Sequence, residues 1–334
     1  MYPAIDQKAI DKAVTVLREG GLVAIPTETV YGLAADADNE EAVMRTFEVK
    51  GRPTNHPLIV HVAGIEALYA WAAYVPDEAL RLARAFWPGP LTMVMPKSAR
   101  CGDFVTGGQD SVALRCPSHP WTHTLLEAFS GNNDAGLTAP SANTFGRISP
   151  TSASHVAADL GEFPSGKLDY ILDGGVCEVG VESTIVNLSG ERPEILRHGA
   201  ITRAMLEAVL ERPVPDAGSD APRASGRLKS HYAPQTKLEL LPAEALVARA
   251  AELAPLPVAV MARPTTLQSL GDNAIYSVAS PDSPSGYAHV LYARLHELDS
   301  AEASRILIEE PAHAPEWAAV NDRLGRAAAD KSHP

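Results

Sequence analysis

One N-terminal segment constrains this chain more than any other: a short apolar run leads directly into a turn rich in hydroxyl groups. The run is 22–25, and the sequence Pro-Thr-Glu-Thr-Val-Tyr-Gly-Leu follows at 26–33. An apolar run of this length is typical of a buried strand. Further on, Lys-Gly-Arg-Pro at 50–53 ends a helix expected over 39–50. Hydroxyls and a carboxylate after a strand, with two cations after a helix, predict a cradle for a small anionic ligand.

Apolar runs and helical patterns continue along the chain. Apolar residues recur at helical spacing after Asp6, which we expect to be an N-cap, and stop before Gly20. A further helix is expected over 76–86. Because strands alternate with helices, the pattern predicts an α/β domain over residues 1–210. We expect its strands at 22–25, 58–62, 91–95, 112–114, 170–172, 184–188 and 194–196.

Residues 211–236 differ in composition from the rest of the chain. Prolines and glycines stand there among small and charged residues. Such a stretch buries too little apolar surface to order itself, so we expect a linker. After it, a second and smaller α/β domain is expected over 237–334. Its predicted strands are 238–241, 257–261 and 275–278, and its predicted helices are 243–253, 286–298 and 315–328.

Composition argues against several classes of protein. A net charge of −13 over 334 residues disfavours a surface that wraps nucleic acid through its phosphates. The three cysteines are widely separated and odd in number, so we expect a reducing compartment and no disulfide framework. Neither a signal peptide nor an apolar stretch long enough to span a bilayer is visible. The sequence therefore predicts a soluble, cytoplasmic protein without a membrane partner.

Common nucleotide and metal signatures do not occur in the sequence. There is no P-loop and no GxGxxG motif after a strand. His56 and His61 are five positions apart, but the residues between them are not helical, so we expect no shared metal. A nucleotide would have to bind by another device.

Several polar segments are candidates for a ligand site, although each also has a structural interpretation. Lys50 and Arg52 fit a solvated helix end as well as an anion contact. The segment 138–151 fits an ordinary polar loop, and 180–187 fits the start of a surface strand. An arginine within an apolar strand is costly unless it is paired, so we expect Arg115 to meet an anion or a carboxylate.

Eight motifs occur in order along the first domain. They are PTETVYGL at 26–33, KGRP at 50–53, LIVHV at 58–62, WPGPLT at 87–92, LR-P-HP at 114–120, APSAN at 139–143, GVESTIV at 180–186 and ILRHG at 195–199. This set closely resembles the YrdC-type family, and specifically the L-threonylcarbamoyladenylate synthases. Ser225-Gly226 and the later HYAP at 231–234 resemble the linker of the family's long form, which has an additional C-terminal domain.

The resemblance implies a fold and a reaction. The fold is a YrdC-like twisted mixed sheet with surrounding helices and a concave ligand cleft, followed by a smaller Rossmann-like α/β C-terminal domain. The reaction converts L-threonine, bicarbonate and ATP into L-threonylcarbamoyl-AMP and pyrophosphate. It is the first step of the threonylcarbamoyl-adenosine modification of tRNA, so a downstream threonylcarbamoyl transferase complex that acts on tRNA would use the product.

The family's functional residues carry over to matching positions of this sequence. The implied threonine contacts are Thr29, His61, Arg115, Ala139 (through its backbone) and Ser183. The implied ATP contacts are Lys50, Arg52, His56, Ser111, Ser141, Ser149, Arg197 and His231.

The chemistry of these residues agrees with the implied reaction. Attack on the α-phosphorus places charge on phosphate oxygens, which Lys50, Arg52 and Arg197 are suited to stabilise. Mg²⁺ would arrive with ATP and be held mainly by phosphates and water, so no protein metal ligands are expected. No nucleophile with a neighbouring base is visible, so positioning would carry the catalysis. The linker 211–236 is long enough to cross the active site and close over the nucleotide.

Other functions stay open at this point. A module of the same fold would bind RNA or the ribosome, although the net charge of −13 argues against stable direct binding of nucleic acid. A carbamoyl transferase of the same fold would carry acylphosphatase and zinc-finger segments, for which this chain has neither the length nor the cysteines. The C-terminal domain would have a regulatory role if it bound a second ligand.

Overall fold

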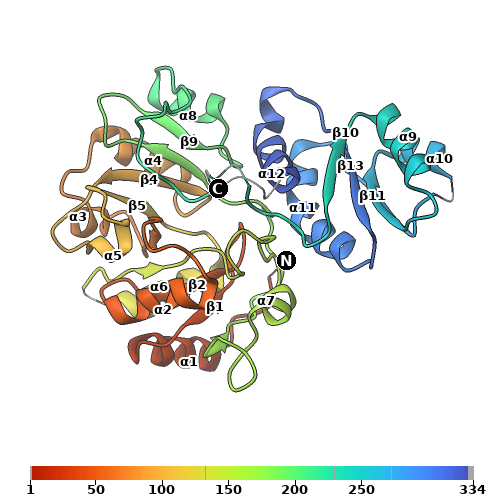
Figure 1. Cartoon of the computed structure of the whole chain (residues 1–334). Coiled ribbons are helices and arrows are strands. Elements are labelled where there is room, and N and C mark those ends of the chain that lie inside the picture. Colours follow the sequence, from red (N-terminus) through yellow and green to blue (C-terminus); the bar gives the residue numbers. More distant parts are fainter. Residues whose placement is uncertain (1, 132, 227, 229, 272, 330–334) are drawn as a thin grey trace. The chain divides into compact units, whose positions relative to one another are not determined.

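The computed structural model describes residues 2–131, 133–226, 228, 230–271 and 273–329. Contacts divide the chain into two compact units, which Figure 1 colours along the sequence. The N-terminal unit comprises 1–145, 150–178 and 182–227, and the C-terminal unit comprises 146–149, 179–181 and 228–334. Two short segments from the middle of the chain therefore belong to the C-terminal unit.

A nine-stranded mixed sheet forms the N-terminal unit. Its strands are β1 (Val23–Ile25), β2 (Gly32–Asp36), β3 (Ile59–His61), β4 (Leu91–Pro96), β5 (Ser111–Arg115), β6 (Leu137–Thr138), β7 (Tyr170–Ile171), β8 (Thr184–Asn187) and β9 (Glu194–Arg197). Their order across the sheet is β7-β1-β2-β6-β3-β5-β4-β8-β9. The pairs β1–β7, β3–β5 and β4–β8 are parallel, and the remaining pairs are antiparallel. The expected mixed α/β sheet is confirmed.

Helices surround this sheet (Figure 1). They are α1 (Gln7–Arg18), α2 (Glu40–Lys50), α3 (Leu68–Trp71), α4 (Asp77–Phe86), α5 (Asp103–Thr106), α6 (Pro120–Ser130), α7 (Ala153–Asp159) and α8 (Arg203–Leu210). The predicted N-cap is confirmed, since Asp6 Oδ1 accepts the Lys8 N–H at 3.0 Å. Helix α2 ends where expected, at Gly51, whose φ of +62° is a left-handed conformation that favours glycine.

Two strands next to the candidate site were not expected from the sequence. β2 pairs antiparallel with β1, with Gly32 opposite Ile25, so residues 26–31 form the loop of a hairpin. The short strand β6 lies between β2 and β3 and is antiparallel to both. The hairpin thus holds the hydroxyl-rich turn at the end of two strands instead of one.

The first part of the predicted linker is ordered on the edge of the N-terminal sheet. The Ile195 N–H donates to Pro215 O at 2.8 Å, and the Ala217 N–H donates back to Ile195 O at 2.9 Å. Val214 is fully buried. The edge of β9 supplies backbone partners that composition does not reveal. The linker's boundaries and its path over the active site stay predictions.

The C-terminal unit is built on a four-stranded parallel sheet. Its strands are β10 (Leu238–Leu241), β11 (Val258–Ala262), β12 (Tyr276–Ala279) and β13 (Arg305–Glu309), and its helices are α9 (Ala243–Leu253), α10 (Pro264–Leu270), α11 (Pro284–Asp299), the 3₁₀ helix η1 (Pro315–Trp317) and α12 (Ala318–Ala328). The strand order is β10-β13-β11-β12. Helix α9 packs with α10, and α11 packs with α12. The Rossmann-like expectation is confirmed, while the central strand β13 and helix α10 were missed.

Candidate active site

The turn between β1 and β2 is held closed by its own hydroxyl groups. Thr27 Oγ1 lies 2.8 Å from Thr29 Oγ1 and donates to Val30 O at 2.6 Å. Both threonines are buried. The Tyr31 hydroxyl at the end of the turn donates to Gly175 O at 2.7 Å. These hydrogen bonds fix the conformation of the turn and therefore the position of Glu28 within it.

Glu28 and Arg115 form a buried ion pair. Arg115 Nη2 lies 2.7 Å from Glu28 Oε1, and both side chains are at most 5% exposed. Glu28 Oε2 also accepts the backbone N–H of Ser118 at 3.2 Å. Within the described part of the chain, Arg115 Nε has no hydrogen-bond partner although it is buried. The expectation that Arg115 meets a carboxylate is confirmed, and an unused donor remains on the same guanidinium.

His61 is placed next to Arg115 by the sheet. The two residues are paired in register where β3 runs parallel to β5. Burial, assisted by the positive charge of Arg115, lowers the pKa of His61 to about 3. The imidazole is therefore neutral at pH 7, with Nδ1 lying 3.2 Å from Ile59 O. A neutral ring beside a guanidinium offers hydrogen bonding without a second positive charge.

Ala139 lies on the other side of β3, in close contact with the hairpin. Its N–H donates to Ile59 O at 3.2 Å. A Cβ atom on Gly32 would approach Ala139 Cβ to 2.9 Å, so the site requires a glycine there. The sheet thus gathers His61, Arg115 and Ala139, three of the residues implied to contact threonine.

Ser183 contacts both Thr92 and Arg197. Its Oγ lies 2.7 Å from Thr92 Oγ1 at the start of β4. Arg197, at the end of β9, donates from Nη2 to Ser183 Oγ at 3.1 Å and from Nε to Ser183 O at 3.0 Å. All three side chains are buried. Ser183 and Arg197, which the resemblance assigns to threonine and to ATP, are therefore in direct contact.

Arg52 and Arg197 share one linker residue, Ser225. Arg52 Nη2 donates to Ser225 Oγ at 3.1 Å and to Pro57 O at 2.9 Å. Arg197 Nη1 donates to the Ser225 carbonyl at 3.1 Å. Both guanidinium groups are buried, at 7% and 6% exposure. Two cations assigned to ATP thus converge on a neutral residue, where a phosphate would be favoured.

Lys50 donates to two backbone carbonyls of a neighbouring loop. Its Nζ donates to Ser141 O and to Asn143 O, both at 2.5 Å, and the side chain is buried. Burial, followed by repulsion from Arg52, lowers the pKa of Lys50 well below its usual value. The amine therefore ties α2 to the loop that carries Ser141. The direct phosphate contact expected of Lys50 from the sequence stays a prediction.

His56 and Ser111 lie near the Arg52 end of the site. Burial lowers the pKa of His56, and the charges of Arg52 and Arg223 lower it further. Ser111 begins β5 whereas Arg115 ends it, so they are separated by about 13 Å along the strand. The space beside Ser111 is only ≈ 10 Å³ and is also lined by Arg223 and Ser225. The space is too small for a nucleotide in this arrangement, so the contact of Ser111 with ATP stays a prediction.

Two of the residues implied to contact ATP belong to the C-terminal unit. Ser149 is fully buried, and its carbonyl accepts from His296 Nε2 at 3.3 Å. The His231 N–H donates to Arg326 O at 3.3 Å, and its ring lies 4.2 Å from that of Tyr232. Their contact with ATP stays a prediction.

Three residues of the site were not selected from the sequence: Glu28, Thr92 and Ser225. Each lies within a motif quoted for the resemblance, so the motifs themselves were the available signal. Their partners are distant in sequence, which is why residue types alone did not reveal them.

The cysteines are unsuited to nucleophilic roles. All three are buried, and burial raises the pKa of Cys101 and Cys116 to about 12 and that of Cys177 as well.

Across the described ranges, no group of three or more His, Cys, Asp or Glu residues is arranged to hold a metal ion. The helices of the described chain include none that is both long and apolar enough for a membrane span.

Two family models together match most of the chain. A model described as telomere recombination matches residues 15–199, and one described as the C-terminal domain of threonylcarbamoyl-AMP synthase matches residues 201–329. This chain belongs to the threonylcarbamoyl-AMP synthase family. The family expected from the eight motifs is confirmed, and with it the long form.

Curated relatives and solved structures agree with this membership. The threonylcarbamoyl-AMP synthase of Pyrococcus abyssi is 44% identical over 239 residues, which are 70% of this chain and 68% of the relative. That of Bacillus subtilis is 41% identical over 236 residues, which are 69% of this chain and 66% of the relative. The crystal structure of P. abyssi Sua5 complexed with L-threonine is similar across 98% of this chain and 96% of its own, with a TM-score of 0.86 and 36% identity. A variant of the same protein gives a TM-score of 0.87.

Proposed function

We propose that this protein condenses L-threonine, bicarbonate and ATP into L-threonylcarbamoyl-AMP with release of pyrophosphate. The similarity to a threonine complex over nearly the whole chain carries the proposal. The enzyme class, a nucleotidyltransferase, follows from family membership. The product would pass to a threonylcarbamoyl transferase complex that modifies tRNA in the cytoplasm.

The threonine carboxylate would bind at Arg115. The Nε atom is a buried donor without a partner in the described chain, and Glu28 fixes the guanidinium from the other side. Neutral His61 and the Ala139 backbone lie on the neighbouring strands. The hydroxyls of Thr29 or Ser183 would bind the threonine hydroxyl. A site built around that hydroxyl rejects analogues lacking it, since its own polar groups would be left unpaired.

The triphosphate of ATP would bind between Arg52 and Arg197. Both guanidinium groups already converge on Ser225, and a phosphate offers stronger, charge-assisted partners than a serine does. The segment around Ser225 would leave and then close over the bound nucleotide, which is the lid role proposed for the linker. His56, Ser111, Ser141, Ser149 and His231 complete the proposed ATP contacts.

Mg²⁺ would fit this arrangement as a companion of ATP. The donors around Ser225 are arginines, which repel a metal ion, so phosphates and water would hold it. When bound, Mg²⁺ would neutralise phosphate charge. The protein's own part is to orient the α-phosphorus and to stabilise the leaving pyrophosphate through Arg52 and Arg197.

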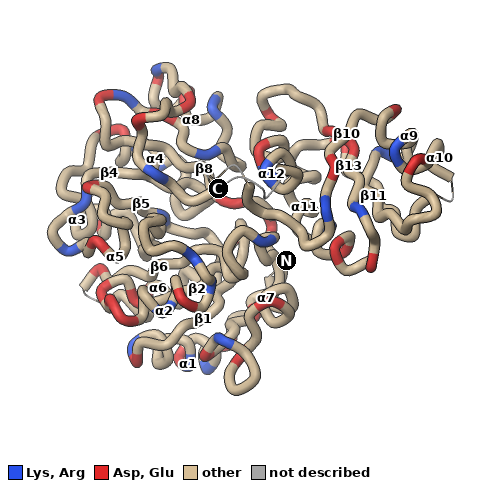
Figure 2. Tube along the Cα trace, in the orientation of Figure 1, with Lys and Arg blue, Asp and Glu red and all other residues tan. Residues whose placement is uncertain are grey.

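The test compares formation of the adenylate product with threonine and with serine. The purified full-length protein is incubated with ATP, Mg²⁺, bicarbonate and either threonine or serine, and adenylates and pyrophosphate are separated by chromatography. Threonine-dependent formation of threonylcarbamoyl-AMP is the expected result. Its absence with every amino acid, together with salt-dependent RNA binding, would favour the RNA-binding alternative. Figure 2 shows basic and acidic residues interspersed along both units, which does not favour that alternative.

A further inference from the structure

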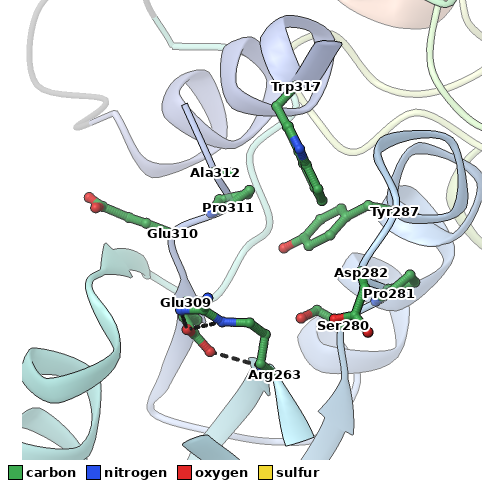
Figure 3. A pocket seen from close by; sticks show the side chains of 10 residues that line it. All are labelled: Arg263, Ser280, Pro281, Asp282, Tyr287, Glu309, Glu310, Pro311, Ala312 and Trp317. Atoms are coloured by element: carbon green, nitrogen blue, oxygen red, sulfur yellow. Dashed lines mark hydrogen bonds and ion pairs between the residues drawn. The ribbon is translucent and has the colours of Figure 1, made fainter. Parts of the chain in front are cut away.

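A cavity opens within the C-terminal unit at the carboxyl ends of its parallel strands (Figure 3). Its volume is ≈ 160 Å³. Arg263 follows β11, Ser280 follows β12, and Glu309 ends β13. The neighbouring strands β11 and β13 continue into different helix pairs, α10 with α9 and α12 with α11. Where neighbouring parallel strands continue into different helix pairs, a crevice opens at their carboxyl ends, and open α/β sheets bind ligands in such crevices.

One buried hydroxyl in this cavity, that of Tyr287, is left without a hydrogen bond by the described residues. Tyr287 on α11 is 2% exposed, and among the described residues its Oη has no hydrogen-bond partner. Figure 3 shows the hydroxyl pointing into the cavity, toward the side of Ser280 and Arg263. Burial, with the nearby charge of Glu309, raises the pKa of Tyr287, so the group stays protonated. A buried hydroxyl without a partner is costly, and a ligand in the cavity would satisfy it.

The charges around the cavity disfavour an anionic ligand. Glu309 accepts the backbone N–H of Arg263 at 2.8 Å and also pairs with its guanidinium, which neutralises that cation. Asp282 lines the same cavity and leaves an excess of negative charge, while Figure 3 shows the carboxylate of Glu310 directed away from it. A phosphate or carboxylate would be repelled, whereas a positively charged group would be attracted.

Aromatic rings provide the remaining surface. The rings of Tyr287 and Trp317 lie 5.8 Å apart at an interplanar angle of 77°, and Trp317 is 9% exposed. An aromatic face attracts a cation, and Trp does so most strongly. A cavity of roughly 150 Å³ holds one benzene molecule, so this one is large enough for a single six-membered ring.

We propose that this cavity binds a ring-sized organic cation, in which a six-membered ring carries a protonated amine. The ring packs against Trp317 and the proline and alanine residues after β13. The ammonium group lies toward Asp282, with the Tyr287 hydroxyl as its hydrogen-bond partner. None of the residues that line this cavity is among the proposed threonine and ATP contacts.

Three molecules of nearly equal shape test the charge preference. Benzylamine, benzyl alcohol and benzoate are titrated separately into the full-length protein by isothermal titration calorimetry at pH 7. Benzylamine is expected to bind at least tenfold more tightly than benzoate, with benzyl alcohol between them. Equal or tighter binding of benzoate, or no binding of benzylamine at tens of millimolar, would overturn the proposal.

Two tyrosine variants locate the binding. Tyr287→Phe removes only the buried hydroxyl and is expected to weaken benzylamine binding about fivefold. Tyr276→Phe is the matched control, because its hydroxyl lies in the same unit but bonds Glu297 at 2.8 Å outside the cavity. It should leave the affinity unchanged. Equal affinities for Tyr287→Phe and the unmodified protein would show that benzylamine binds elsewhere.

Discussion

Arg52 and Arg197 hold the same linker residue, one through its hydroxyl and the other through its carbonyl. Both donor–acceptor distances to Ser225 are 3.1 Å. In this arrangement the linker occupies the donors that the proposed reaction assigns to phosphate. Under the proposed function, ATP and Ser225 would compete for these two arginines, and that competition can be measured.

Ser225→Ala should tighten binding of a non-hydrolysable ATP analogue. The change removes the hydroxyl that accepts from Arg52 and donates to Pro57 O, so releasing the linker costs less. One net hydrogen bond is worth about 1 kcal/mol, or roughly fivefold in affinity. Calorimetric titration gives the dissociation constant of the ATP analogue. The control is Ser219→Ala, because Ser219 is an exposed serine of the same linker. Weaker binding would mean that Ser225 contacts the nucleotide itself.

Arg115→Lys should raise KM for threonine by about tenfold or more. Lysine keeps the charge but loses the planar set of donors that pairs with Glu28 and, as proposed, with the carboxylate of threonine. Affinity for ATP should be preserved because Arg115 lies at the opposite end of β5 from Ser111. Steady-state kinetics with threonine and ATP varied separately give the KM for each substrate. An equal loss for both substrates would contradict separate subsites.

Glu28→Gln should destabilise the protein by about 3 kcal/mol. The change leaves the Arg115 guanidinium buried without a countercharge. Asp38→Asn is the matched control, since its ion pair with Arg100 is partly exposed and should cost about 1 kcal/mol or less. Urea unfolding measures the free energy of unfolding of both variants. Equal small effects would show that the Glu28–Arg115 pair is not desolvated in solution.

Lys50→Met should weaken threonine and ATP together. Two backbone carbonyls of the 141–143 loop lose their donor, so the loop that carries Ser141 and follows Ala139 should shift. If Lys50 instead contacts phosphate, as expected from the sequence, only ATP affinity and turnover should fall. Separate titrations of threonine and of the ATP analogue decide between these outcomes.

Stability should fall as pH is lowered because of His61. Its pKa is about 3 in the folded protein against 6.5 ordinarily, so between these values the unfolded chain binds more protons. Each pH unit lowered in that window should cost about 1.4 kcal/mol from this group. His61→Gln should remove that slope, whereas His123→Gln, a half-buried control on α6, should keep it. Urea unfolding at several pH values gives the comparison, and parallel curves for His61→Gln and the unmodified protein would contradict it.

The sequence predicted elements with a local signal and missed those that depend on distant partners. Helix α2 and its stop at Gly51 follow from spacing and from glycine's left-handed preference. Strand β13 has only three central apolar residues and becomes evident only between β10 and β11. Strand β2 overlaps only the last two residues of the 26–33 motif and pairs antiparallel with β1 and with the distant β6. Parallel pairing across the chain leaves no trace in local composition.

In the candidate site too, the sequence predicted what depends on local residue types and missed what depends on distant partners. Arg115 could be expected to meet a carboxylate because a lone cation in an apolar strand must be paired. That the carboxylate is Glu28, 87 positions earlier, depends on the hairpin and on β5. Lys50 was assigned by its charge, yet its contacts are two carbonyls brought close by tertiary folding.

The C-terminal unit takes residues 146–149 and 179–181 from the middle of the chain. Within that unit, a Cβ on Gly180 would lie only 2.4 Å from the Ala288 carbonyl, and Val181 is fully buried. A stop codon after residue 210 would therefore leave two segments without the surface that covers them. Gene fragments of this protein should be designed around spatial units, and a shortened product that aggregates would say nothing about whether the catalytic chemistry needs the missing part.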